Sequence, residues 1–151
     1  MTKYADAVPA LAQAGGVVVI PTDTVYGLAA RAADPEAVER LYQLKSRDDK
    51  PGTLIAANFD QLETLGLKRR YLKAVEQFWP GAVSVVIPCA DPSLKYLHRG
   101  LQSLAVRIPE PADLRELLEA TGPLLTSSAN HPGEPTATTI DEARTYFGDK
   151  I

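Results

Sequence analysis

Residues 17–28 read VVVIPTDTVYGL, and this stretch combines a strand pattern with a cluster of polar side chains. Its first four residues are β-branched and apolar and are bounded by Gly16 and Pro21, which predicts a buried strand. The hydroxyls and carboxylate of residues 22–24 follow directly, and such groups can hold a small polar ligand through hydrogen bonds. Because threonine, aspartate and proline are also typical of turns, a turn and a ligand-binding strand-to-loop element are both open interpretations.

Outward from this stretch, strand patterns alternate with helical ones. Helices are expected over residues 4–14, 35–45, about 72–79, about 114–118 and 139–148, and strands over 17–20, 53–57, 83–87, 104–108 and 124–126. Asp34 and Pro35 are interpreted as the N-cap and first residue of their helix, and Gly122 closes another. The alternation predicts a single α/β domain over residues 1–151, with a twisted mixed or mostly parallel sheet and helices on both faces.

Composition narrows the class of protein. With 45% hydrophobic and 23% charged residues, the chain is typical of a soluble globular protein. The single cysteine, Cys89, excludes a disulfide framework and is interpreted as a core residue in a reducing compartment. Trp79 is likewise expected to be a core anchor. The N-terminus has no signal pattern and no apolar run approaches the ~20 residues that a bilayer requires, so a cytoplasmic protein without a membrane span is expected.

The net charge of −3 argues against a dedicated nucleic-acid binder, whose affinity comes largely from phosphate neutralisation. Basic residues are nevertheless clustered locally. The cluster at residues 68–73 is interpreted as a solvated helix face. Lys45, Arg47 and Lys50, at the predicted end of a helix, can complement the negative helix terminus or hold a triphosphate. Walker and Rossmann glycine motifs are absent, so a nucleotide site would be of another type.

A third polar group follows the last predicted strand, where residues 126–133 read TSSANHPG. Ser128 and Asn130 stand two apart around a small residue and can direct a hydroxyl and an amide at one ligand. The Pro-Gly pair is also typical of an ordinary loop. The density of hydroxyl and amide side chains favours a site.

Taken in order, four motifs resemble one known family. They are PTDTVYGL at 21–28, KSR at 45–47 followed by Lys50, AVRIP at 105–109, and TSSAN at 126–130 with PGEPT at 132–136. Their order and approximate spacing resemble those of the YrdC/Sua5 family, and most closely its short bacterial, TsaC-type members. The likeness extends over about residues 7–147, and it rests on the four motifs together rather than on any one.

The resemblance implies an L-threonylcarbamoyladenylate synthase, a nucleotidyltransferase that joins L-threonine, bicarbonate and ATP and releases pyrophosphate. Its product supplies the t6A37 modification of tRNA through transfer proteins of the TsaB, TsaD and TsaE type. Mg²⁺ is expected to accompany ATP, no protein metal ligands are expected, and weak binding of tRNA or double-stranded RNA is a further expectation.

The same resemblance implies a role for each matching residue. Threonine-side residues are expected to be Thr22, Thr24, Tyr26, Arg107 and Thr126. ATP-side residues are expected to be Arg47, Lys50, Ser103, Ser128, Asn130 and Thr136. Lys45 and Arg47 are expected to act in catalysis by stabilising charge on the leaving pyrophosphate. A Ser-His-Asp or Cys-His set is not needed for this chemistry, because transfer to phosphorus depends on positioning and charge neutralisation.

The chain departs from the family pattern in two places. Asp48 and Asp49 stand in a segment about one residue short, and both acids are expected to face solvent. Family members continue past the final helix with strands that close over the site, whereas this sequence stops at Ile151, so those strands are expected to be missing. Two other functions stay open: an RNA-binding module without catalysis, and a related domain that forms a carbamoyl-adenylate without threonine.

Overall fold

The computed structural model describes residues 7–21, 26–45, 52–81, 83–89, 91–99 and 102–128. Within them, six strands form one sheet in the order β1-β2-β6-β3-β5-β4. The strands are β1 (Val17–Pro21), β2 (Tyr26–Arg31), β3 (Thr53–Ile55), β4 (Val85–Pro88), β5 (Ser103–Arg107) and β6 (Leu124–Ser128). The helix expected at 139–148 lies outside the described residues.

The sheet is mixed, as the sequence predicted, but it is not mostly parallel. Of the strand pairs in the described residues, only β3 with β5 is parallel; β1–β2, β2–β6, β3–β6 and β4–β5 are antiparallel. The reason for the first pair is the short connection between β1 and β2. Four residues cannot form the long crossover that parallel neighbours require, whereas an antiparallel pair can be joined by a short turn.

The helical segments are α1 (Ala7–Ala12), α2 (Pro35–Lys45), α3 (Phe59–Leu65), α4 (Arg69–Ala74), α5 (Lys95–His98) and α6 (Ala112–Thr121), with 3-10 turns η1 (Glu76–Phe78) and η2 (Pro92–Leu94). The helix expected at about 72–79 is therefore two pieces, α4 and η1. β2, α3 and α5 were not predicted. Among the described residues, no helix is long and apolar enough to cross a membrane.

Asp34 begins α2 as predicted. Its carboxylate accepts hydrogen bonds from the backbone N–H groups of Glu36 (3.1 Å) and Ala37 (3.3 Å), two of the donors that a helix start leaves without partners. Later in the chain, the N–H of Gly122 bonds the carbonyl of Leu118 (2.8 Å) and ends α6. Gly122 has a φ of 85°, which glycine adopts readily.

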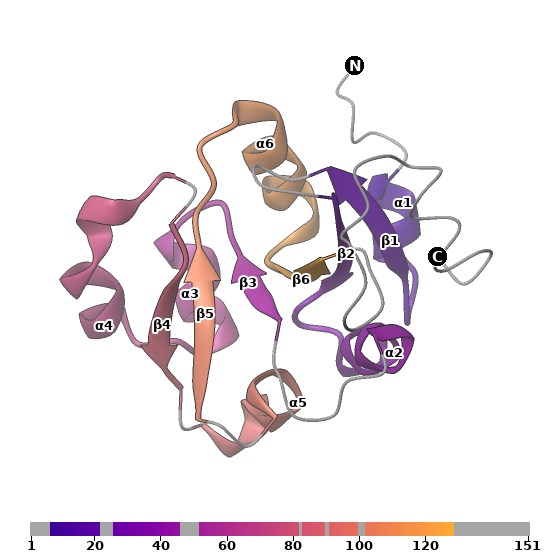
Figure 1. Ribbon diagram of the computed structural model, residues 1–151, viewed down its shortest axis with the longest axis horizontal. Coiled ribbons are helices and arrows are strands. Elements are labelled where there is room, and N and C mark those ends of the chain that lie inside the picture. The colour runs from indigo at the N-terminus through magenta and orange to yellow at the C-terminus, as the bar shows by residue number, and fades with distance from the viewer. Residues whose placement is uncertain are drawn as a thin grey trace.

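Two apolar clusters cover the two faces of the sheet. The first cluster packs helices α2 to α5 on one face through residues such as Val38, Leu62 and Leu97. The second cluster packs α1 and α6 on the other face through Leu11, Leu114 and Leu117. In Figure 1, β4 and β5 lie with α3 and α4 on one side of the molecule, and β1 lies with α1 on the other. We call the faces covered by the first and second clusters the first face and the second face of the sheet.

Candidate functional site

A row of side chains crosses the second face from β6 to β4. Thr126 pairs with Thr53, Thr53 pairs with Ala105, and Ala105 pairs with Val86. Paired residues in neighbouring strands point to the same face of a sheet. Thr126 shares its face with Leu124, two residues away, which belongs to the second cluster. Val86 is 66% exposed, so the β4 end of this row is open to solvent rather than covered by α1 and α6.

Arg107 lies one step along β5 from this row, on the same face, because it stands two residues after Ala105. Its side chain is only 6% exposed, and its Nη1 donates a hydrogen bond to Ser84 Oγ at 3.2 Å. A buried guanidinium is costly unless charged or polar groups surround it. Its planar fork also suits a carboxylate, which it can hold with two parallel hydrogen bonds. Arg107 therefore gives the face a cationic group beside small hydroxyl side chains.

Thr126 and Thr53 stand next to each other at the β6 end of the row and are hydrogen-bonded. Thr126 is 6% exposed, and its Oγ1 donates a hydrogen bond to the backbone carbonyl of Thr53 at 3.0 Å. Gly52 packs against the same strand, since a Cβ built on it would lie 2.3 Å from the carbonyl oxygen of Thr126. The glycine is thus required for the start of β3 to approach β6 this closely.

Ser103 begins β5 and lies on the same face as Ala105 and Arg107, paired across the sheet with Pro88. Ser128 ends β6, where its backbone pairs with Gly27 of β2. The structure therefore brings Ser103, Arg107 and Thr126 together on one face, with the backbone of Ser128 at the end of the adjoining strand. Thr53, Gly52 and Ala105 were not among the predicted site residues. A hydroxyl residue directly after a Pro-Gly turn, at the start of a strand, was the signal for Thr53.

Tyr26 is placed differently from these residues. It alternates with Gly27 along β2 and packs against the first cluster, on the opposite face of the sheet. Its role in threonine binding stays a prediction. Lys45 is the last residue of α2. Thr22, Thr24, Arg47, Lys50, Asn130 and Thr136 lie outside the described residues, and their assignments also stay predictions.

Three of the predicted motifs adjoin strands that end or begin at the same edge of the sheet. β1 and β6 end at the same edge of the sheet at which β2, β3 and β5 begin, because Pro21 pairs with Tyr26, Gly27 with Ser128, and Thr53 with both Thr126 and Ala105. The segments 22–25, 46–51 and 129 onward are joined to these ends in sequence. The motifs containing Thr24, Arg47 and Asn130 are thus attached to one edge of the sheet.

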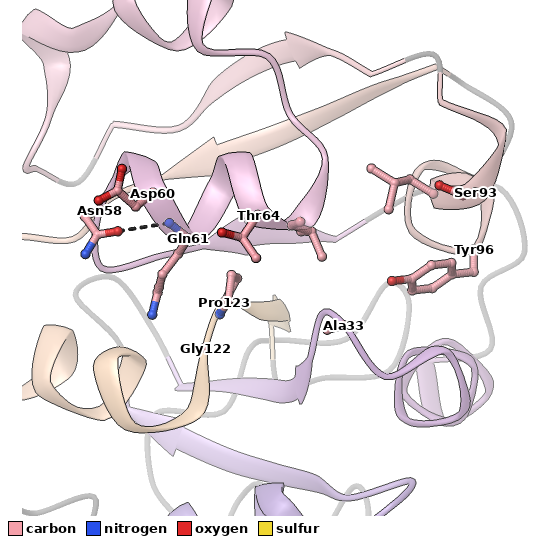
Figure 2. Close-up of a pocket in the computed structure, with 11 residues that line it drawn as sticks. Ala33, Asn58, Asp60, Gln61, Thr64, Ser93, Tyr96, Gly122 and Pro123 are labelled. Atoms are coloured by element: carbon pink, nitrogen blue, oxygen red, sulfur yellow. Dashed lines mark hydrogen bonds between the residues drawn. The ribbon is translucent and has the colours of Figure 1, made fainter.

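A cavity of about 610 Å³ lies near the opposite edge, between α3 and the η2–α5 segment. Figure 2 shows Asn58, Gln61 and Thr64 facing Ser93 and Tyr96 across it. Its polar groups bond within the protein: the Tyr96 hydroxyl donates to the carbonyl of Ala32 (2.7 Å), and Gln61 Nε2 donates to the carbonyl of Leu118 (2.8 Å). Of the predicted site residues that the structure describes, none lines this cavity. The cavity is therefore separate from the face that carries Arg107 and Thr126.

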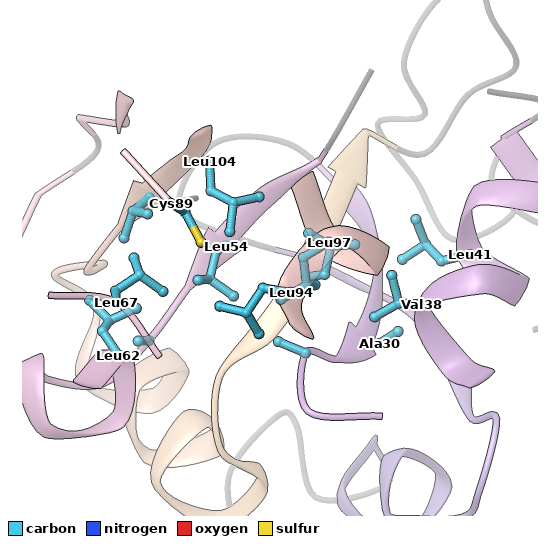
Figure 3. Packing of buried hydrophobic residues seen from close by; sticks show 14 of the residues in the cluster. Ala30, Val38, Leu41, Leu54, Leu62, Leu67, Cys89, Leu94, Leu97 and Leu104 are labelled. Carbon is cyan, nitrogen blue, oxygen red and sulfur yellow. The ribbon is translucent and has the colours of Figure 1, made fainter. Parts of the chain in front are cut away.

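Cys89 is buried in the first cluster, beside Leu54 and Leu104 in Figure 3. Burial raises the pKa of its thiol, so the thiolate needed for nucleophilic attack is disfavoured at neutral pH. This confirms the interpretation of Cys89 as a core residue. Trp79 is half-buried and packs against the first cluster, with its ring edge-on to Phe59 at 6.2 Å between centroids. It therefore lies at the margin of the core rather than inside it. In the described part of the chain, no group of three or more acidic, histidine or cysteine side chains could hold a metal ion.

These features define a class of protein: an α/β domain whose mixed sheet carries hydroxyls and a buried arginine on one partly open face. Comparison with known proteins places it more narrowly. Residues 10–151 match the model of the Sua5/YciO/YrdC family, described as "Telomere recombination", and the chain belongs to this family. The resemblance found in the sequence motifs is therefore confirmed.

Relatives and solved structures agree with this assignment. The threonylcarbamoyl-AMP synthase of Chromohalobacter salexigens is 37% identical over 153 residues, covering 99% of this chain and 82% of the relative. That of Pyrococcus abyssi is 35% identical over 141 residues, covering 91% of this chain and 42% of the relative. The structure of P. abyssi Sua5 complexed with L-threonine superposes with a TM-score of 0.82 at 33% identity, covering 97% of this chain and 44% of that one. The chain thus spans less than half of the archaeal relative.

Proposed function

We propose that the chain is an L-threonylcarbamoyladenylate synthase, which converts L-threonine, bicarbonate and ATP into threonylcarbamoyl-AMP and pyrophosphate. The observation that carries this proposal is the second-face row of Thr126, Thr53 and Ala105 beside buried Arg107. This row belongs to a chain whose fold matches a protein complexed with L-threonine. The relative from Chromohalobacter salexigens, of which the match covers 82%, bears the name threonylcarbamoyl-AMP synthase.

On this proposal, Arg107 pairs with the carboxylate of threonine and Thr126 lies beside the same substrate. The amine nitrogen of threonine joins bicarbonate and releases water, forming a carbamate. A carbamate oxygen then attacks the α-phosphorus of ATP, and the bond to the pyrophosphate oxygen breaks. The protein contributes mainly positioning and charge neutralisation in such a transfer. Lys45, Arg47 and Lys50 are the cations proposed for the leaving pyrophosphate, with Ser103, Ser128, Asn130 and Thr136 on the nucleotide side.

Mg²⁺ is proposed to arrive with ATP, held mainly by the phosphates. Mg²⁺ at nucleotide sites usually keeps several waters and uses only one or two carboxylates besides the phosphates. The proposal therefore does not need a set of protein ligands that encloses the ion. We also propose a cytoplasmic location and transfer of the adenylate to proteins of the TsaB, TsaD and TsaE type, since threonylcarbamoyl-AMP needs an acceptor reaction to yield modified tRNA.

The RNA-binding alternative gains little from the basic cluster at residues 68–73. Arg69 Nη2 donates hydrogen bonds to Glu63 Oε2 at 2.8 Å and Asp60 Oδ1 at 3.0 Å. Acidic side chains of α3 therefore already neutralise one positive charge of the cluster. Arg70 lies over the ring of Tyr71, 4.8 Å from its centroid. Any RNA contact through this surface is therefore proposed to be weak and sensitive to salt.

Pyrophosphate release and adenylate formation test the proposal directly. The protein is incubated with ATP, Mg²⁺, bicarbonate and L-threonine, and each component is omitted in turn. Both products should require threonine and bicarbonate. Turnover that continues without threonine would support a carbamoyl-adenylate domain instead, and absence of any adenylate from the complete mixture would refute catalysis by this chain.

Replacing Arg107 by alanine tests whether this buried arginine binds the threonine carboxylate, a role that an exposed arginine would not have. The KM for threonine should rise at least tenfold while the KM for ATP changes less than about twofold, because a two-point carboxylate contact is lost. Arg107→Lys should recover only part of the affinity, since lysine keeps the charge without the fork. Arg70→Ala, at an exposed arginine of α4, is the matched control and should behave like the unmodified protein. Equal rises in both KM values would contradict the assignment.

A further inference from the structure

Tyr42 is a buried residue of α2 whose hydroxyl joins three parts of the fold. Its side chain is 2% exposed and belongs to the first cluster. The hydroxyl accepts a hydrogen bond from the backbone N–H of Gly52 at 3.0 Å and donates one to the carbonyl of Leu97 at 3.0 Å. One oxygen atom therefore connects α2, the residue before β3 and α5.

The ring of Tyr42 is held in place as firmly as its hydroxyl. The guanidinium of Arg99 lies over the ring, 4.7 Å from its centroid, and such a contact is attractive. Arg99 Nη1 also pairs with Glu39 Oε2 at 3.0 Å, and Glu39 stands one helical turn before Tyr42 on α2. The ring is thus fixed by a residue from outside α2 that is itself anchored to α2.

Through its hydrogen bond to Gly52, Tyr42 is connected along the backbone to Thr53, a residue of the second face. Gly52 is in close contact with the carbonyl of Thr126, and the next residue, Thr53, accepts the hydroxyl bond of Thr126. Tyr42 also stands three residues before Lys45, the last residue of α2. It is therefore tied both to the end of α2 and to the start of β3, and these two points flank the sequence that contains Arg47 and Lys50.

We propose that Tyr42 is a positioning residue, whose hydroxyl fixes the spacing between the end of α2 and the Gly52–Thr53 start of β3. This inference rests on the proposed function. On that function, the fixed spacing aligns the cations proposed for ATP with the residues proposed for threonine. Misalignment of two bound substrates by about 1 Å can lower a rate by up to about 100-fold. Tyr42 acts through the backbone and touches neither substrate.

The test compares Tyr42→Phe with Tyr96→Phe. Each variant removes one buried or half-buried hydroxyl that donates to a backbone carbonyl, and the Tyr96 hydroxyl bonds Ala32 near the opposite edge of the sheet. Steady-state kinetics are measured well below the melting temperature of both variants. We expect kcat at saturating threonine and ATP to fall about tenfold or more in Tyr42→Phe and to stay within twofold in Tyr96→Phe. A merely structural role would lower both melting temperatures and leave both kcat values unchanged.

Amide hydrogen exchange around Gly52 gives a second readout that does not depend on the reaction. Exchange in the segment containing residues 52–55 should be faster in Tyr42→Phe than in the unmodified protein and unchanged in Tyr96→Phe. Normal kinetics of Tyr42→Phe in an active enzyme would overturn the inference while leaving the proposed function intact. If the unmodified protein formed no adenylate, the proposed function would fail, and equal exchange in both variants would then also overturn the structural role of Tyr42.

Discussion

Gly52 has no room for a side chain, because the neighbouring strand occupies the space that a Cβ would need. A Cβ at this position would lie 2.3 Å from the carbonyl oxygen of Thr126, and that atom belongs to the backbone, which cannot rotate away as a flexible side chain can. The sequence marks this position only as a Pro-Gly pair, a common turn signal. Its packing role follows from the pairing of β3 with β6.

Gly52→Ala should therefore destabilise the protein and damage the site together. The free energy of unfolding should fall by about 1–3 kcal/mol, the usual cost of forcing extra atoms into a packed position. Because Thr53 and Thr126 must shift, kcat/KM for threonine should fall as well. Thermal unfolding and steady-state kinetics measure the two effects. The comparison is Gly81→Ala, where a Cβ would lie within 4 Å of one atom of the described residues, the carbonyl oxygen of Phe78 at 3.1 Å. Equal losses in both variants would refute the special role of Gly52.

At the scale of elements, α2 begins at a carboxylate that also accepts a hydrogen bond from the connection between α1 and β1. Besides its bonds to the helix start, Asp34 Oδ2 accepts the N–H of Gly15 at 3.0 Å and pairs with Arg31 at 3.5 Å. Burial acts to raise the pKa of Asp34, but the hydrogen bonds from Gly15, Ala37 and Glu36 and the charge of Arg31 together hold that pKa below its usual value. The folded state therefore favours the ionised carboxylate.

Stability should depend on pH through this residue. Because the pKa is lowered on folding, the ionised Asp34 stabilises the protein above the unfolded pKa of about 3.9, and this contribution is lost as pH falls through the folded pKa. At pH 7, Asp34→Ala should cost about 1 kcal/mol or more, since the helix cap is removed.

Asp34→Asn isolates the charge, because asparagine can still cap a helix. The melting temperature of Asp34→Asn should lie below that of the unmodified protein at pH 7, and the gap should close as the pH is lowered below about 4. Unfolding followed at a series of pH values measures this. A gap that stays constant from pH 7 to pH 3 would show that the charge contributes nothing.

At the scale of the whole molecule, both apolar clusters pack on one sheet. Leu114 is fully buried in the second cluster, against the face that carries Thr126. Trp79, the single tryptophan of the chain, packs against the first cluster on the other face. If the sheet unfolds as a unit, a substitution that destabilises one cluster should also lower the unfolding midpoint of the other.

Leu114→Ala tests this cooperativity. The variant should lose about 2–5 kcal/mol, typical of a buried leucine truncation, and its melting temperature should fall by roughly 5–15 °C. Trp79 fluorescence and far-ultraviolet circular dichroism should report the same lowered midpoint. Val86→Ala, at an exposed position, is the control and should change the midpoint little. An unchanged Trp79 transition in Leu114→Ala would show that the two faces unfold separately.

Several elements were predictable because their signals are local. The capped start of α2 at Asp34, its end at Lys45 and the glycine that closes α6 all lie within a few residues of the structure they specify. β2 was missed because residues 26–31 read YGLAAR, with no β-branched residue. It is a strand because β1 and β6 bond it from both sides, and neither partner can be recognised from the residues of β2 alone.

The sequence by itself determined the α/β class, the helix start at Asp34, the helix end at Gly122 and the four ordered motifs that resemble the family. Tertiary structure alone decided that Thr126, Thr53 and Arg107 share one face while Tyr26 packs on the other. The physical reason is that strand order and register are set by pairing between segments far apart in the chain, and a shift of one residue would move a side chain to the opposite face. The motifs identify the polar residues, and the register of the strands determines which of those residues are adjacent on one face.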